Sequence, residues 1–307
     1  MSDINSKLLL ALNLLNEKLR RAIDAIPAAE RKELQEIRLR RGKKLSAVAY
    51  GFEYFVTSDG RLMRSPAYAL DVTDSDIMYT YEASLEHSVY AYEREISHGY
   101  VTTQGGNRVG FCGKAVYGSE GIQSLKDISS VNIRISREVK GCANEIFSRY
   151  YSGAPVSLLI TGPPSSGKTT LLRDLCSKLS DKYTVSLIDE RNEIASVYNG
   201  IPQNDVGQRT DIFCSYDKYS AIMTSIRVMS PQIIICDEIG GGDELKALEY
   251  ALNSGVKLIA TCHAGDINEV RKRPVISKLI KGKAFDNAVI LSDRPFVGKP
   301  EAFYELK

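Results

Sequence analysis

The sequence predicts an α/β protein in which a doubly wound, mostly parallel sheet domain follows a smaller α+β domain. From about residue 150, apolar runs without strict alternation recur between helical stretches, which is typical of strands buried on both faces of a parallel sheet. Before about residue 140, short strands alternate charged and apolar residues, as half-buried strands do. We therefore assign residues 1–140 to the N-terminal α+β domain and residues 141–307 to the second domain.

The N-terminal part opens with an amphipathic helix and continues as a β-rich unit. An apolar stripe at helical spacing predicts the helix, which is too short and too polar to span a bilayer; its members are Leu8, Leu12, Leu15 and Leu19. The segment "EIRLRRG" (36–42) predicts a half-buried strand, and Thr73 with Asp76 marks a helix start. The last strand of this part is "VNIRIS" (131–136), and we expect a connecting helix near 137–150.

Five apolar runs predict the sheet of the second domain. They are "VSLLITG" (156–162), "TVSLIDE" (184–190), "PQIIICDEIG" (231–240), "VKLIATCHAG" (256–265) and "NAVIL" (287–291). We expect the second run to neighbour the first in the sheet. In such folds ligands bind outside the carboxyl ends of the strands, so the residues that follow each run are the candidates for a site.

The first of these runs leads into a phosphate-binding loop. Residues 162–169 spell G-x-x-x-x-G-K-[ST] between a predicted strand and a Leu-spaced helix, and this context argues against a chance turn. Inward-pointing N–H groups and the helix N-terminus form a cradle for phosphate oxygens, while the lysine reaches the β- and γ-phosphates. The predicted nucleotide-binding residues are Gly162, Pro163, Pro164, Ser165, Ser166, Gly167, Lys168, Thr169 and Thr170.

The third run ends in two adjacent carboxylates. Asp237 is placed to hold Mg²⁺ together with the hydroxyl of Thr169, and Glu238 is placed to orient or deprotonate an attacking water. An acidic pair in a surface turn would look the same in isolation, but the P-loop favours the catalytic interpretation. The sequence lacks the Asn-Lys-x-Asp motif that reads guanine. We therefore expect ATP and Mg²⁺ as the ligands.

Two further strand ends carry polar groups that could complete the site. The run at 184–190 leads into Asp189, Glu190, Arg191 and Glu193, whose alternative interpretation is a solvated ion-pair surface. The run at 256–265 delivers Thr261 and His263, either of which could sense the γ-phosphate. A lone histidine after a core strand is also a common structural turn residue, so that alternative stays open.

The composition is that of a soluble globular protein. Hydrophobic residues make up 43% and charged residues 25% of the chain, and the formal net charge is +2, which gives no pointer to a polyanionic partner. The six cysteines form no C-x-x-C pair, and the preferred interpretation is reduced cytosolic thiols.

Several motifs together resemble one bacterial family. They are "EIRLRRGK", "YEREISHGYVTTQGGNRVGFCG", "GPPSSGKTTLLRDL", "DERNEIA", "GQRTDI", "IRVMSPQIIICDEIGG" and "ATCHAG". Across nearly the whole chain they resemble the stage III sporulation protein AA family of endospore-forming bacteria. That family is similar to the type II and type IV secretion ATPases, in which an N-terminal domain accompanies a RecA-like motor domain and a hexameric ring works at the cytoplasmic face of a membrane channel. Unlike those ATPases, this chain has an aspartate at position 237 and no cysteine-rich metal insert.

The resemblance implies a mother-cell ATPase that acts with membrane proteins of the channel linking mother cell and forespore. We expect a cytoplasmic hexamer that is recruited to the membrane by these proteins, with no transmembrane segment of its own and no nucleic-acid partner. The predicted catalytic residues are Lys168, Glu190, Arg227, Glu238 and His263. The alternative is a RecA-like motor that depends on nucleic acid, to which the basic stretch "RLRRGKK" (38–44) could contribute.

An arginine from a neighbouring subunit is expected to complete the site, because phosphoryl transfer builds negative charge on the γ-phosphate oxygens. The P-loop and the Asp237–Glu238 segment contain no arginine placed to reach that charge. The candidates are Arg108, Arg134, Arg209 and Arg227, for each of which surface ion pairing is the alternative.

Overall fold

The computed structural model describes residues 2–88, 92, 95–96, 99–118, 121–292 and 298–306, and these fold into two compact units. The first unit comprises Met1–Arg137 together with Tyr198–Gln203, and the second comprises Glu138–Val197 together with Asn204–Lys307. The sequence carries no signal that residues 198–203 belong with the first unit. In that unit the N–H of Gly105 donates to Oε1 of Gln203 over 2.8 Å.

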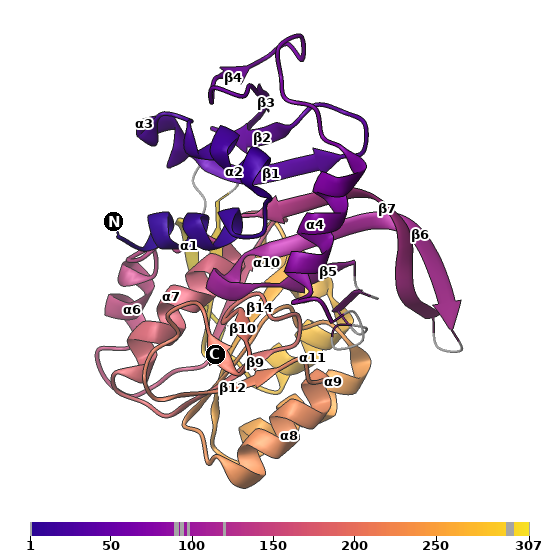
Figure 1. Cartoon of the computed structure of the whole chain (residues 1–307). Coiled ribbons are helices and arrows are strands. Elements are labelled where there is room, and N and C mark those ends of the chain that lie inside the picture. The colour runs from indigo at the N-terminus through magenta and orange to yellow at the C-terminus, as the bar shows by residue number, and fades with distance from the viewer. Residues whose placement is uncertain are drawn as a thin grey trace. The chain divides into compact units, whose positions relative to one another are not determined.

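The first unit is built on a seven-stranded, antiparallel sheet (Figure 1). In spatial order its strands are β4 (Leu62–Met63), β3 (Phe52–Val56), β2 (Ser46–Ala49), β1 (Leu34–Arg40), β7 (Gly121–Arg134), β6 (Arg108–Gly118) and β5 (Tyr100–Thr102). The other elements among the described residues are α1 (Ser2–Leu12), α2 (Glu17–Asp24), α3 (Ala28–Arg31), α4 (Asp74–Ser84), the 3-10 turn η2 (Gln104–Gly106), and the short strands β11 (Ile201–Pro202) and β10 (Val197–Tyr198), of which Val197 belongs to the second unit.

The predicted amphipathic stripe lies in the core of this unit. Leu8, Leu12, Leu15 and Leu19 are all buried, as are Ile37 and Leu39 of β1. The helix start at residue 73 is confirmed as a capping box: the Thr73 hydroxyl accepts from the N–H of Asp76, and the Asp76 carboxylate accepts from the N–H of Thr73. The buried faces of the N-terminal helices and of β1 thus share one core, as the sequence predicted for an α+β unit.

The second unit contains a seven-stranded sheet whose first six strands are parallel. Its spatial order is β12 (Thr210–Cys214), β9 (Val185–Asp189), β13 (Ile233–Cys236), β14 (Lys257–His263), β8 (Leu158–Gly162), β15 (Asn287–Leu291) and the antiparallel edge strand β16 (Pro300–Glu305). The helices are α6 (Asn144–Tyr150), α7 (Lys168–Ser180), α8 (Lys218–Val228), α9 (Gly242–Asn253), α10 (Ile267–Lys272) and α11 (Pro274–Lys281).

Helices cover both faces of this sheet, as a doubly wound fold requires. Alternate residues of the buried strands point into two separate cores. In β8, Ile160 belongs to the core that includes residues of α6 and α7, whereas Leu159 belongs to the core that includes residues of α8, α9, α10 and α11. Figure 1 shows α8 and α9 as neighbours on one side of this unit, where their buried faces meet. Strands buried on both faces explain why the apolar runs in the sequence lack alternation.

One expectation about the sheet is wrong. The strand β9 does not neighbour the P-loop strand β8, because β13 and β14 lie between them. Hydrophobic periodicity identifies buried strands but contains no information about their order, and parallel crossovers can skip positions. As a result, it is the end of β14, with Thr261 and His263, that lies directly beside the P-loop.

The segment that leads into the second unit is helical only in its second half. Residues 138–143 form no helix, and α6 begins at Asn144. Both carboxylate oxygens of Asp174 on α7 accept main-chain N–H groups from this segment, those of Gly141 (3.0 Å) and Ala143 (2.8 Å). These bonds hold residues 141–143 in a turn before α6, instead of the helix expected from residue 137. Within the described ranges, every helix is too short or too polar to cross a membrane.

Candidate active site

The P-loop joins β8 to α7 in the strand, loop and helix context that its motif requires. The loop depends on main-chain conformations that favour glycine: Gly167 has a φ of 89°, and Ser165 has a φ of 65°. A Cβ on Gly162 would lie 2.6 Å from the Ser166 hydroxyl and 3.1 Å from the Cβ of Leu291. The two glycines of the motif are therefore required by local geometry.

The side chain of Lys168 folds back over this loop. Its Nζ donates to the carbonyl oxygens of Gly162 (2.9 Å) and Pro163 (2.8 Å) and lies 3.1 Å from Nδ1 of His263. Burial lowers the pKa of Lys168, and the negative charges of Asp237 and Glu238 act in the opposite direction. A polyphosphate would offer this ammonium stronger, charged acceptors in place of the two carbonyls.

The loop residues fit a phosphate group. The hydroxyl of Ser166 is buried and has no hydrogen-bond partner, although the carbonyl of the same residue accepts from the N–H of Gly298 (2.7 Å). A buried hydroxyl without a partner is costly, and a bound oxyanion would satisfy it. Thr170 and Pro163 stand at half-buried positions in the same loop and helix start, while Pro164 and Ser165 are exposed.

Asp237 is held between two hydroxyl groups. Its Oδ2 accepts a hydrogen bond from Thr169 Oγ1 over 2.8 Å, and its Oδ1 accepts one from Thr261 Oγ1. The predicted Mg²⁺ pair, Thr169 and Asp237, is thus in direct contact. A hydroxyl and a carboxylate oxygen are hard ligands of the kind that Mg²⁺ takes alongside water and phosphate oxygens, so this donor set fits the ion. Of the residues that the structure describes, no three or more His, Cys, Asp or Glu side chains form a metal-binding group.

The carboxylate of Glu238, the residue after Asp237, contacts two basic side chains, an arginine and a histidine. Its Oε1 lies 3.3 Å from Nε2 of His263, and its Oε2 lies 3.2 Å from a guanidinium nitrogen of Arg191. Because the other ring nitrogen of His263 contacts Lys168, a continuous chain of contacts runs from the P-loop lysine through His263 to Glu238. The Glu238 side chain remains 41% exposed, which leaves it open to water.

The acidic cluster after β9 has divided roles. Asp189 is buried and accepts main-chain N–H groups from Glu193 (2.9 Å), Ile194 (3.1 Å) and Ala195 (2.8 Å), so it shapes its own loop. Burial raises the pKa of Asp189. Glu190 is exposed and pairs with Lys218 over 3.3 Å. Sequence reasoning missed Lys218 altogether, because a single lysine at a helix start gives no signal of a site.

Of the four candidate arginines, the two in the second unit, Arg209 and Arg227, lie away from this cluster. Arg227 is exposed in the last turn of α8, about 13 Å along the helix axis from Lys218 at its start. Arg209 donates to the carbonyl of Asp181 (3.0 Å). In the first unit, Arg108 lies over the ring of Tyr100 and Arg134 pairs with Glu36. An arginine supplied by another subunit therefore stays a prediction.

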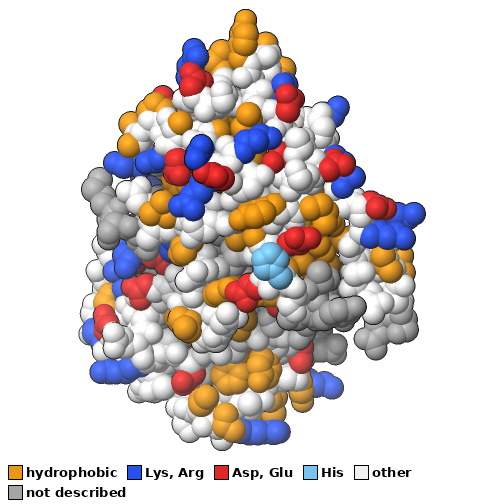
Figure 2. All heavy atoms as spheres, in the orientation of Figure 1, with side chains coloured by type: hydrophobic (Ala, Val, Ile, Leu, Met, Phe, Trp, Pro, Cys, Tyr) orange, Lys and Arg blue, Asp and Glu red, His pale blue; other side chains and the backbone are white. Residues whose placement is uncertain are grey.

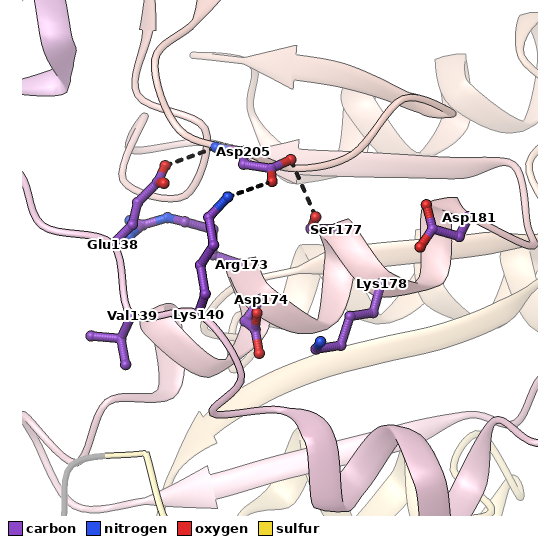
Figure 3. Close-up of a pocket in the computed structure, with 9 residues that line it drawn as sticks. All are labelled: Glu138, Val139, Lys140, Arg173, Asp174, Ser177, Lys178, Asp181 and Asp205. Carbon is purple, nitrogen blue, oxygen red and sulfur yellow. Dashed lines mark hydrogen bonds and ion pairs between the residues drawn. The ribbon is translucent and has the colours of Figure 1, made fainter. Parts of the chain in front are cut away.

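A polar pocket of about 200 Å³ lies along α7 (Figure 3), and none of its lining residues belongs to the P-loop. Asp205 joins its walls: its N–H donates to Glu138, and its carboxylate accepts from Lys140 (3.1 Å) and Ser177 (3.2 Å). The remaining lining residues are Val139, Arg173, Asp174, Lys178 and Asp181. Asp205 bonds Lys140, and Asp174 accepts the main-chain N–H groups of Gly141 and Ala143. We therefore assign the pocket a structural role in holding residues 138–143 against α7.

Charge is mixed on the face that Figure 2 shows, where basic and acidic side chains of the described residues are interspersed. All six cysteines lie within the described residues and none forms a disulfide. Burial raises the pKa of Cys176 and of Cys236 to about 12, so both remain protonated thiols at neutral pH.

Comparison with known proteins identifies relatives along the whole chain. The family model described as sporulation stage III, protein AA matches residues 7–307. The stage III sporulation protein AA of Bacillus subtilis (strain 168) is 34% identical over 298 residues, which cover 95% of this chain and 93% of that protein. Protein SEEDLING PLASTID DEVELOPMENT 1 of Arabidopsis thaliana is 30% identical over 159 residues, covering 50% of this chain and 23% of the plant protein.

Solved structures share the fold. The ATPase DotB of Legionella pneumophila aligns with a TM-score of 0.54 at 15% identity, covering 89% of this chain and 74% of DotB. The pilus retraction motor PilT with bound ADP aligns with a TM-score of 0.56 at 13% identity, covering 93% of this chain and 80% of PilT. These likenesses confirm the predicted fold class, a RecA-like P-loop domain preceded by a smaller α+β domain.

Proposed function

Because the chain belongs to the sporulation stage III, protein AA family, we propose that it is an ATP-hydrolysing motor that drives or gates a membrane assembly during endospore formation. In this proposal it forms a ring, with six subunits as in the resembling secretion ATPases, at the cytoplasmic face of the channel between mother cell and forespore. Membrane proteins of that channel recruit it. The observation that carries the proposal is the contact chain from Lys168 through His263 to Glu238, beside the Thr169–Asp237 pair.

The chain's own residues divide the work of hydrolysis. The P-loop N–H groups and Lys168 bind the β- and γ-phosphates and neutralise charge that grows during phosphoryl transfer. Thr169 and Asp237 hold Mg²⁺, which supplies Lewis-acid stabilisation of the phosphate oxygens. Glu238 orients a water molecule and takes its proton, and its 41% exposure gives water access to the carboxylate.

His263 connects the two halves of this machinery. In the structure it contacts Lys168 on one side and Glu238 on the other. When Lys168 turns toward phosphate oxygens, His263 loses this contact and keeps the one with Glu238. His263 therefore reports the state of the P-loop to the carboxylate that acts on water, which is the role of a γ-phosphate sensor. Glu190 assists at a distance, through its pairing with Lys218.

The test is ATP hydrolysis by Glu238→Gln, compared with the parent and with Glu249→Gln, an exposed glutamate on α9. Removing a general base lowers the rate by about 10²- to 10⁴-fold, so we expect a loss of that size in single-turnover hydrolysis while binding of Mg·ATP is retained. The control variant should match the parent. Equal hydrolysis by Glu238→Gln and the parent would rule out Glu238 as the catalytic carboxylate.

The hydrolysis-blocked variant also tests the assembly. Glu238→Gln with bound ATP should form closed rings that are visible by electron microscopy. The protein should sediment with native membranes of sporulating cells and not with protein-free vesicles. ATP turnover that rises with single-stranded DNA, in a salt-dependent manner, would instead support a nucleic-acid motor.

A further inference from the structure

The main chain of Glu238 has a conformation that a glutamate does not favour by itself. Its φ is 48°, in the left-handed region where a Cβ crowds the neighbouring carbonyl. Non-glycine residues stay in this region only when surrounding contacts hold them there. The contacts made by the main chain of Glu238 therefore decide where its carboxylate lies.

Two side chains from other elements bond to this main chain. The N–H of Glu238 donates to Oγ1 of Thr261 on β14 over 2.7 Å. The carbonyl oxygen of Glu238 accepts from Nζ of Lys218, the first residue of α8, over 2.6 Å. The main chain of Glu238 is thus held at its N–H by β14 and at its carbonyl by α8.

The ammonium group of Lys218 has a complete set of acceptors. Its side chain is only 10% exposed, and besides the Glu238 carbonyl it reaches Glu244 Oε1 (3.2 Å) and Glu190 Oε2 (3.3 Å). Three N–H groups thus meet three oxygens. Burial alone would lower the pKa of Lys218, but the charges of Glu244 and Glu190 raise it above its ordinary value. The ammonium group is therefore charged at neutral pH, and its three acceptors fix its position.

Glu244 extends this hold to the rest of the loop. Its second oxygen, Oε2, accepts the N–H groups of Gly240 (3.1 Å) and Gly241 (3.2 Å). Lys218 and Glu244 are bonded to each other, so the segment 238–241 is fixed at its beginning by one and at its end by the other. Two successive glycines would otherwise leave this segment free to move.

The helix itself gives no reason for a lysine at position 218. Asp217 already caps α8 by accepting from the N–H of Ser220 (2.9 Å). A cation in the first turn opposes the helix dipole, which favours negative charge at that end. A side chain that is unfavourable for its own helix is typically kept for a contact outside that helix. For Lys218 this contact is the hydrogen bond to the Glu238 carbonyl.

We propose that Lys218 is a positioning residue for hydrolysis, which holds the main chain of Glu238 in its left-handed conformation and so aims the Glu238 carboxylate at the attacking water. The proposal rests on the function proposed above. It assigns Lys218 no contact with nucleotide or water. Its effect on the rate must therefore pass entirely through Glu238.

A double-mutant cycle tests this dependence. Lys218→Met removes the ammonium at similar length, and a displacement of about 1 Å in a reacting group can cost up to about 100-fold in rate. We expect kcat to fall about 10- to 100-fold while KM for ATP stays within about twofold. In the Glu238→Gln background the same change should lower kcat no further, because the carboxylate it aims is already gone. Lys246→Met, an exposed lysine of α9, is the matched control and should leave kcat unchanged.

The outcomes separate this proposal from the one on which it rests. If Glu238→Gln is slow but Lys218→Met is as fast as the parent, the positioning role is wrong and the motor function stands. If Lys218→Met slows the Glu238→Gln protein by the same factor as the parent, Lys218 acts independently of Glu238 and the role is again wrong. If Glu238→Gln is as fast as the parent, Glu238 is not the catalytic carboxylate, and the positioning role of Lys218 is wrong with it. Should Lys218→Met not fold, Lys218→Gln, which removes the charge and is too short to keep the bond to the Glu238 carbonyl, repeats the cycle, and the same non-additivity is required.

Discussion

Thr261→Val should destabilise the second unit more than its size change suggests, because it removes two hydrogen bonds with no loss of volume. The Thr261 hydroxyl is buried, accepts from the N–H of Glu238 (2.7 Å) and donates to the Asp237 carboxylate. A stranded buried N–H costs about 1–3 kcal/mol and a lost bond to a charged group about 1.5–3 kcal/mol, so we expect a loss of about 2–5 kcal/mol after relaxation. At about 2–4 °C per kcal/mol for a domain of this size, Tm should fall by about 5–15 °C.

Thr161→Val is the matched control for this measurement. Thr161 is equally buried, on the adjacent strand β8, but its hydroxyl contacts only neutral groups, donating to the carbonyl of Ala264 (2.9 Å) and contacting the thiol of Cys262. Its loss should cost about 1 kcal/mol, and Tm should fall by about 2–4 °C. Thermal unfolding followed by circular dichroism gives both values under the same conditions. If Thr261→Val is as stable as Thr161→Val or more so, Thr261 does not bridge Asp237 and Glu238 in solution.

Three further changes test other parts of the molecule. Lys168→Ala should abolish ATP turnover and leave Tm close to that of the parent; turnover at the parent rate would refute the P-loop assignment. Asp76→Asn should lower stability at pH 7 and flatten its acid dependence. Burial tends to raise the pKa of Asp76, but hydrogen bonds from Lys18 and Thr73 lower it overall. Its contribution is therefore present above the unfolded pKa of about 3.9 and is lost as the pH falls through the lower folded value. Urea midpoints that vary with pH in parallel for both proteins would contradict this. Finally, an inactive Arg227→Ala protein mixed with Lys168→Ala should regain turnover in joint oligomers, and failure to do so would exclude Arg227 as a residue supplied in trans.

The parts of the site that the sequence predicted are those fixed by local geometry. Gly162, Gly167 and Lys168 follow from the spacing of one loop, whose main chain admits few other residues. Asp237 and Glu238 follow from their place at the end of a buried strand. The order of strands was not predictable, because each apolar run is compatible with several neighbours. That order brings β14 beside β8, and it turns His263 from one candidate among several into the link between Lys168 and Glu238.

The bonds of Lys218 and Thr261 to the main chain of Glu238 were not predictable from the sequence for a different physical reason. Lys218 lies 20 residues before Glu238 and Thr261 lies 23 residues after it, so their contacts depend on how α8 and β14 pack and not on any spacing in the sequence. A left-handed glutamate is unfavourable on its own and becomes stable only through these two bonds. The conformation of the catalytic segment is therefore a property of three elements together. A displacement of α8 against the sheet would release the Glu238 carbonyl before it disturbed the P-loop, because Lys218 belongs to α8 whereas Lys168 bonds within its own loop. The contacts of Lys218 and those of Lys168 are thus independent, so Glu238 can lose this support while the loop at 162–168 keeps its own.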